Sequence, residues 1–138
     1  MPLPHKLFCD TSFFYACCDP SDVNHRRAAA LVRELAVSPS ELAATWDIIG
    51  ETVTLLSYRR SHREAVRFLD EVKPRLRIVD YGGRVRTVAE EVFRRRGRGR
   101  RLSFCDAVSF VVVTTLLDHR PCLAFDRDFR ALGLTVVG

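Results

Sequence analysis

Short apolar runs alternate along the chain with longer segments in which apolar residues recur every three or four positions. The short runs are typical of buried strands, and the longer spacing is typical of amphipathic helices. The pattern predicts strands at residues 6–10, 42–45, 76–80, 122–125 and 134–137. It predicts helices at 11–17, 22–37, 46–60, 62–72, 83–93 and 103–118. Strands separated by helices indicate an α/β fold with a short parallel sheet of four to five strands and right-handed crossovers.

Three of the predicted helices carry an apolar face that we expect to pack on the sheet. The expected core positions are Ala28, Leu31, Val32 and Leu35, then Ile49, Val53 and Leu56, and finally Val85, Val88, Val92 and Phe93. No repeat or linker interrupts the sequence. We therefore predict one domain over residues 1–138, with residues 1–5 as a flexible N-terminal tail.

The composition narrows the class of protein. A chain of 138 residues that is 47% hydrophobic can bury a sizeable core. Residues 1–6 lack the apolar stretch of a secretory signal, and the longest apolar run, 110–117, is too short to cross a bilayer. The five cysteines have no framework spacing, and the four histidines form no zinc-ligand spacing with them. We expect a cytoplasmic protein with reduced thiols and no membrane partner.

The net charge of +5 comes from one segment. Six arginines lie in the run RRRGRGRR at residues 94–101, and without them 16 basic residues face 17 acidic ones. The run is therefore a basic patch on a nearly neutral body. Arginine pairs well with phosphate, which favours contact with a nucleic-acid backbone. The alternative is a solvated helix end whose charges complement the helix dipole.

Four acidic residues lie in or next to apolar segments that we expect to be buried: Asp10, Glu51, Asp106 and Asp126. Asp10 and Asp126 follow apolar runs, which places them at the carboxyl ends of predicted strands, where open α/β sheets bind ligands. Glu51 and Asp106 interrupt strongly apolar helical segments. Because a buried carboxylate is costly without a partner, a shared divalent cation is the simplest explanation for all four. Hard oxygen ligands favour magnesium or manganese.

Each acid also has a structural interpretation. Asp10 is a favoured helix N-cap residue, and residues 103–106 have the spacing of a capping box. Asp126 fits a turn or the cap of a short helix, and Glu51 could pair with an arginine. The sequence alone leaves these alternatives open for each acid taken singly, whereas the four together indicate one pocket.

Polar neighbours add to this set. Ser12 could supply a hydroxyl to a metal or a water molecule, and Asp128 is close enough to Asp126 to reach the same ion. Asp47 is interpreted as a solvated or capping residue. Asp80 ends a predicted strand beside Gly82-Gly83, so we expect it to cap the following helix.

Four motifs carry a resemblance to a known family: FCDTS at 8–12, WDIIGET at 46–52, LSFCDAVS at 102–109 and LAFDRDF at 123–129. In their order and spacing, which span nearly the whole chain, the sequence resembles the PIN-domain family. It is most similar to the VapC-type toxin ribonucleases within that family.

The resemblance implies a PIN-like three-layer fold and an endoribonuclease that cleaves RNA with magnesium or manganese. It assigns the metal site to Asp10, Glu51, Asp106 and Asp126, and adds Asp128 and Ser12 to the catalytic residues. It also implies a small antitoxin partner and a homodimer. The arginine run is variable in the family, so its role is our own expectation: RNA phosphates contact Arg94, Arg95, Arg96, Arg98, Arg100 and Arg101.

Three other classes of protein compete with a toxin nuclease. A signalling receiver domain shares an acidic magnesium pocket, and Asp80 could be its phosphoacceptor. That class also needs a basic residue on a late strand, and no lysine follows Lys73. A non-catalytic metal-binding module would not need all four acids. A PIN-domain nuclease that processes RNA without being a toxin stays open.

Overall fold

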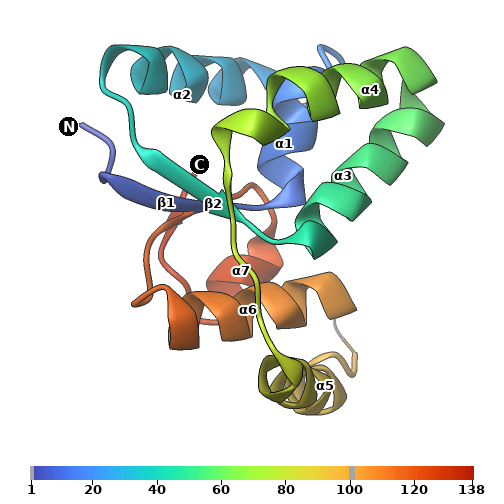
Figure 1. Cartoon of the computed structure of the whole chain (residues 1–138), viewed down its shortest axis with the longest axis vertical. Helices are drawn as coiled ribbons and strands as arrows, with labels where there is room; N and C mark the ends of the chain where they lie inside the picture. The colour runs from blue at the N-terminus through green and yellow to red at the C-terminus, as the bar shows by residue number, and fades with distance from the viewer. Residues whose placement is uncertain (1, 100–101) are drawn as a thin grey trace.

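The computed structural model of the protein describes residues 2–99 and 102–138. Its five-stranded sheet is parallel throughout and has the order β3-β2-β1-β4-β5. The strands are β1 (Lys6–Cys9), β2 (Glu41–Ala44), β3 (Arg77–Ile78), β4 (Cys122–Leu123) and β5 (Val136–Val137). Helices α1 to α4 cover one side of the sheet and α5 to α7 cover the other (Figure 1). The α/β three-layer fold predicted from the sequence is confirmed.

The helices follow the strands closely along the chain. They are α1 (Thr11–Cys18), α2 (His25–Val37), α3 (Trp46–Arg59), α4 (His62–Glu71), α5 (Gly83–Arg96), α6 (Phe104–Leu116) and α7 (Arg127–Ala131), with a 3-10 turn η1 (Lys73–Arg75) after α4. One residue, Asp10, separates β1 from α1, and one residue, Thr45, separates β2 from α3. The amino ends of these helices therefore gather at the carboxyl edge of the sheet.

The central strand explains why the sheet forms. Leu7, Phe8 and Cys9 are fully buried because β1 has a strand on each side and helices on both faces. Such strands read as continuous apolar runs rather than alternating ones. Phe8 pairs in register with Ala43 of β2 and Cys122 of β4.

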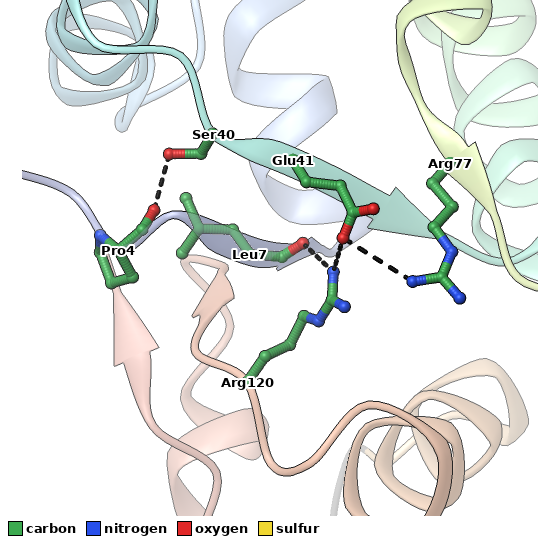
Figure 2. Close-up of polar contacts among 6 residues, drawn as sticks. All are labelled: Pro4, Leu7, Ser40, Glu41, Arg77 and Arg120. Atoms are coloured by element: carbon green, nitrogen blue, oxygen red, sulfur yellow. Dashed lines mark hydrogen bonds and ion pairs between the residues drawn. The ribbon is translucent and has the colours of Figure 1, made fainter.

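A group of charged side chains joins the strands at the opposite, amino edge (Figure 2). The nearly buried guanidinium of Arg120 donates to Glu41 Oε2 at 2.9 Å, and Arg77 lies 3.7 Å from the same oxygen. Arg120 enters the sheet from a turn in which Asp118 and His119 have left-handed φ angles of 49° and 54°. Aspartate and histidine are among the non-glycine residues that adopt this backbone conformation most readily.

The N-terminal residues also contact this edge. Ser40 Oγ donates to the carbonyl of Pro4 at 2.6 Å (Figure 2), and Leu3 packs against the core. Met1, part of the predicted tail, lies outside the described residues. Within residues 2–99 and 102–138, no helix combines the length and hydropathy needed to cross a membrane.

Several details differ from the expectation. The strands are shorter than predicted except β2, which keeps its predicted length but begins one residue earlier. Helix α2 begins at His25 rather than at residue 22. Val32, Val88 and Phe93 were expected in the core but are 45%, 41% and 40% exposed. They lie on the sides of their helices, and Phe93 packs edge-on against Phe104 at the surface. The apolar stripes are thus narrower than the periodicity suggested.

Candidate active site

Asp10 occupies the junction of β1 and α1. Its Oδ2 accepts hydrogen bonds from the backbone N–H of Ser12 at 3.1 Å and from the Ser12 hydroxyl at 2.5 Å, so it caps α1 as its residue type predicts. The side chain is only 2% exposed. Its other oxygen, Oδ1, is buried and has no hydrogen-bond partner. Capping therefore accounts for one oxygen and leaves the second available to a cation.

Ser12 connects this aspartate to the end of β4. Its hydroxyl donates to Asp10 and accepts the backbone N–H of Phe125 at 2.9 Å. The sequence suggested that this hydroxyl would serve a metal or a water molecule. In the structure both of its hydrogen bonds are to protein groups, and they orient the carboxylate.

Asp106 combines its two predicted roles. Its backbone N–H donates to Ser103 Oγ at 3.0 Å, and its Oδ2 accepts the Ser103 N–H at 3.1 Å, which completes the capping box of α6. The side chain is nearly buried and at the same time lines the pocket that contains Asp10. The capping and the site interpretations are therefore compatible.

Asp126 and Asp128 lie at the short helix α7. Asp126 caps α7 by accepting the N–H of Asp128 at 2.9 Å. One carboxylate oxygen each from Asp106, Asp126 and Asp128 lies within 4.8 Å of the others. Asp128, an uncertain member from sequence, thus belongs to the most compact acidic group, because the first turn of α7 directs it back toward Asp126.

One pocket of about 380 Å³ collects the predicted acids. Its lining includes Asp10, Glu51, Asp106 and Asp126, together with Thr11, Ser12, Tyr15, Asp22, Asn24, Leu55, Arg59, Ser103 and Phe125. Asp10 and Asp126 are the N-cap residues of α1 and α7, and Glu51 and Asp106 lie within α3 and α6. The structure therefore brings all four together, as their positions predicted.

The electrostatics of the pocket penalise its negative charges. Burial raises the pKa of Asp10 to about 6, although the hydrogen bonds from Ser12 lower it. The charges of Glu51 and Asp126 raise the Asp10 pKa further. The pKa of Asp106 is raised to about 7, first by burial and second by the charge of Asp10. A raised pKa means that the ionised form of the carboxylate is disfavoured, and a nearby cation would favour that form again.

The donor set fits a hard divalent cation. The pocket offers carboxylate oxygens, one of them buried without a partner. Oxygen ligands of this kind suit magnesium or manganese, whereas zinc sites favour nitrogen and sulfur. Burial, followed by the charges of the neighbouring carboxylates, raises the pKa of the Cys105 thiol far above its ordinary value, which disfavours a thiolate ligand.

Among the described arginines of the run, Arg94, Arg95, Arg96 and Arg98, none lines the pocket. Arg94 and Arg95 both pair with Glu91, at 3.5 and 2.7 Å, and Arg96 stacks over Phe110. Arg98 is exposed after the end of α5. Arg100 and Arg101 lie outside the described residues. The RNA contact expected of this run stays a prediction.

Two other expectations change. Asp47 accepts a hydrogen bond from the Tyr81 hydroxyl at 2.5 Å, so it is a partly buried tertiary contact rather than a solvated residue. Asp80 does not cap α5, because Gly82 occupies the N-cap position without a side-chain bond.

Sequence reasoning missed the residues at the far end of the pocket: Tyr15, Asp22, Asn24 and Arg59. They follow no motif, and only the four-residue spacing from Glu51 to Leu55 to Arg59 could have indicated that Arg59 faces the same way.

Comparison with known proteins agrees with this geometry. The family model of the PIN domain matches residues 7–134. The chain is 33% identical over 132 residues to the 23S rRNA-specific endonuclease VapC20 of Mycobacterium tuberculosis, covering 95% of this chain and 97% of that protein.

Solved structures repeat the fold. The crystal structure of VapC20, described as a sarcin-ricin loop cleaving toxin, superposes with a TM-score of 0.79 at 31% identity, over 94% of this chain and 96% of that one. VapBC2 from Rickettsia felis, bound to a promoter DNA fragment, gives 0.69 at 13% identity over 96% and 97% of the two chains. FitAcB from Neisseria gonorrhoeae gives 0.65 at 12% identity over 96% of each chain. The last two show likeness of fold only.

Proposed function

Because the chain belongs to the PIN-domain family, we propose that it is a magnesium- or manganese-dependent endoribonuclease and the toxin of a toxin–antitoxin pair. One observation carries the proposal: four carboxylates from four separate segments of the chain line one pocket, and a buried oxygen of Asp10 has no partner there. The relative VapC20 is named for cleaving 23S rRNA. Structured ribosomal RNA is therefore the substrate class that we propose to test first.

The residues divide the work of hydrolysis between them. Asp10, Glu51, Asp106 and Asp126 would hold the cation, with Asp128 beside Asp126. A bound divalent ion supplies charge neutralisation at the phosphate and lowers the pKa of a water molecule. Ser12 and Ser103 fix the rotamers of Asp10 and Asp106 through their hydrogen bonds. A carboxylate of this set that does not hold the cation would accept the proton of the attacking water.

The activity is tested with purified protein, ribosomes and total RNA in magnesium or manganese. We expect discrete fragments, mapped by primer extension, that disappear in EDTA and in Asp106→Asn. Absence of cleavage with both metals, together with no metal-dependent rise in Tm, would refute the proposal. An RNA substrate of this kind lies in the cytoplasm, where we expect the protein to act.

An apolar groove provides the antitoxin site. It measures about 1050 Å³ and lies between α1, α2 and α4, and its lining includes Phe14, Val32, Leu35 and Phe68. Val32 is 45% exposed there. A groove of this kind suits the apolar face of a partner helix, so we propose that the antitoxin covers it.

The partner is tested by co-expression with the product of the adjacent gene. We expect co-purification that Val32→Glu abolishes and that Val37→Glu preserves, because Val37 is exposed on the same helix outside the groove lining. Both variants should keep nuclease activity. If nothing co-purifies and overexpression is harmless, an RNA-processing nuclease that is not a toxin replaces this part of the proposal. Light scattering of the purified protein tests the expected homodimer.

A further inference from the structure

The acidic pocket continues as a groove between α1 and α3. Glu51, Leu55 and Arg59 are spaced by four residues on α3, and all three line the pocket. Tyr15 of α1 lines it opposite them, and Figure 1 shows α1 and α3 side by side. At 1.5 Å per residue, eight residues separate the Cα atoms of Glu51 and Arg59 by about 12 Å. Arg59 therefore marks a position along the groove beyond the metal site.

Arg59 differs in its surroundings from the other arginines near the site. Its guanidinium carbon lies 5.3 Å from the centroid of the Tyr15 ring. Tyr15 is itself fixed, because its hydroxyl donates to Asp19 at 2.6 Å. Arg59 forms no ion pair within the described part of the chain, whereas Arg60, its neighbour, lies 3.8 Å from Asp19. Apart from its contact with Tyr15, the Arg59 guanidinium has no carboxylate partner among the described residues, so it keeps donors for a further acceptor.

Arg59 also brings a positive charge to a pocket whose other charged lining residues, among those described, are acidic. Among the lining residues that the structure describes, Arg59 is the one lysine or arginine, and the others include five carboxylates. Asp22 is one of these, but its Oδ1 already accepts the N–H of Asn24 at 2.8 Å. Asn24 precedes α2 without using its side chain as a cap, which leaves its amide as a second donor at this end.

We propose that Arg59 binds a phosphate of the RNA backbone next to the scissile one, with Tyr15 holding the guanidinium in place. The inference rests on the proposed ribonuclease function. Once the scissile phosphate is held at the acids, the strand can continue only over surface that tolerates its charge. The guanidinium fork pairs with two phosphate oxygens at once, so Arg59 sets the direction in which the strand leaves the metal site.

The first experiment measures binding without cleavage. Affinity for a fluorescein-labelled twelve-nucleotide RNA is determined in EDTA for the wild type, Arg59→Gln, Arg59→Lys and Arg60→Gln. We expect Arg59→Gln to weaken binding about tenfold or more and to reduce the log–log salt slope by about 0.7. Arg59→Lys should fall between, because it keeps the charge but loses the stacked fork. Arg60→Gln is the matched control for charge and should remain within about twofold of the wild type.

The second experiment locates the contact. Single phosphates of the same RNA are replaced by neutral methylphosphonates. The wild type should lose affinity strongly at one position near the cleavage site, and Arg59→Gln should lose nothing further there. In the presence of manganese, Arg59→Gln should raise KM far more than it lowers kcat, because a phosphate held equally in substrate and transition state contributes uniform binding.

The outcomes separate this inference from the nuclease proposal. If the wild type cuts RNA and Arg59→Gln behaves like Arg60→Gln, the inference is wrong and the nuclease proposal stands. If Arg59→Gln instead loses the antitoxin while its RNA affinity is unchanged, the arginine binds the protein partner and the inference is again wrong. If RNA binds through Arg59 but is never cut, the contact is correct and the nuclease proposal fails.

Discussion

Replacing Asp10 by asparagine should stabilise the protein in the absence of metal while abolishing its activity. The substitution keeps the shape of the side chain, and the amide oxygen can still accept the two hydrogen bonds from Ser12. It removes a negative charge that is 2% exposed and close to other carboxylates. The cost of burying that charge is what the variant avoids.

The pKa shift of Asp10 gives the magnitude. A rise from 3.8 to about 6 corresponds to about 2.2 units, or about 3 kcal/mol at 1.36 kcal/mol per unit. Because the folded-state pKa is raised, the folded protein holds this proton more tightly than the unfolded chain does. The destabilisation caused by the Asp10 charge is therefore absent below about pH 4. It grows as the pH rises and is fully present once the pH exceeds about 6. Asp106, with a pKa of about 7, acts in the same direction.

Asparagine recovers part of this loss. Its buried NH₂ group costs about 1 kcal/mol if it finds no acceptor, so a net gain of about 2 kcal/mol remains at pH 8. In a domain of this size that gain raises Tm by roughly 5–10 °C. At pH 4.5 Asp10 is already protonated, and the advantage of the variant should disappear.

Urea unfolding followed by circular dichroism, in EDTA at pH 4.5 and pH 8, measures both quantities. Asp70→Asn, at an exposed position on α4, is the control and should match the wild type. Addition of manganese should stabilise the wild type, since it binds the folded state, and should leave Asp10→Asn nearly unchanged. If Asp10→Asn is less stable than the wild type at both pH values, the buried charge of Asp10 is not the main cost at this site and the reasoning fails.

The remaining predictions concern the other charged groups. Asp126→Asn should weaken manganese binding, measured by calorimetry, more than Asp128→Asn does. Both residues belong to the compact acidic group, but only Asp126 is among the described residues that line the pocket. Equal losses would contradict this ranking. Arg98→Gln should weaken binding of unrelated RNA sequences equally and flatten the salt dependence by about 0.7 per lost phosphate contact, without changing metal affinity. Arg120→Met should lower the urea midpoint clearly, because it leaves Glu41 without its closest cation. Arg67→Met, which breaks an exposed pair within α4, should leave the midpoint almost unchanged.

The sequence predicts the part of this molecule that depends on local pattern. Asp10 and Asp126 could be placed because an acid directly after a buried strand has only one edge of a parallel sheet to occupy. The capping box at Ser103 was likewise readable, because it depends on a three-residue spacing. These features need no knowledge of how distant segments meet.

Other features depend on packing that no local pattern specifies. Arg59 reads as an ordinary solvated residue at the end of a helix, and its place in the groove follows from the approach of Tyr15 on another helix. Asp47 appeared solvated because its partner, Tyr81, is 34 residues away. Val32 and Phe93 satisfied the helical period, but α2 packs mainly against α1 and α5 against α6, so each apolar stripe is covered only in part.

The hydrogen bonds of Ser12 have a consequence for the time at which the enzyme becomes active during its own synthesis. Asp10 donates its N–H to Leu123, and Ser12 accepts from Phe125, a contact across 113 residues. Asp10 and Ser12 are therefore synthesised early, and they lack these hydrogen-bond partners until β4 and the residues before α7 have been synthesised. Contacts of such sequence separation form late, since the loop between them must close first. A nascent chain that ends before residue 122 should bind no manganese, and ribosome-bound chains of increasing length would reveal the point at which binding begins.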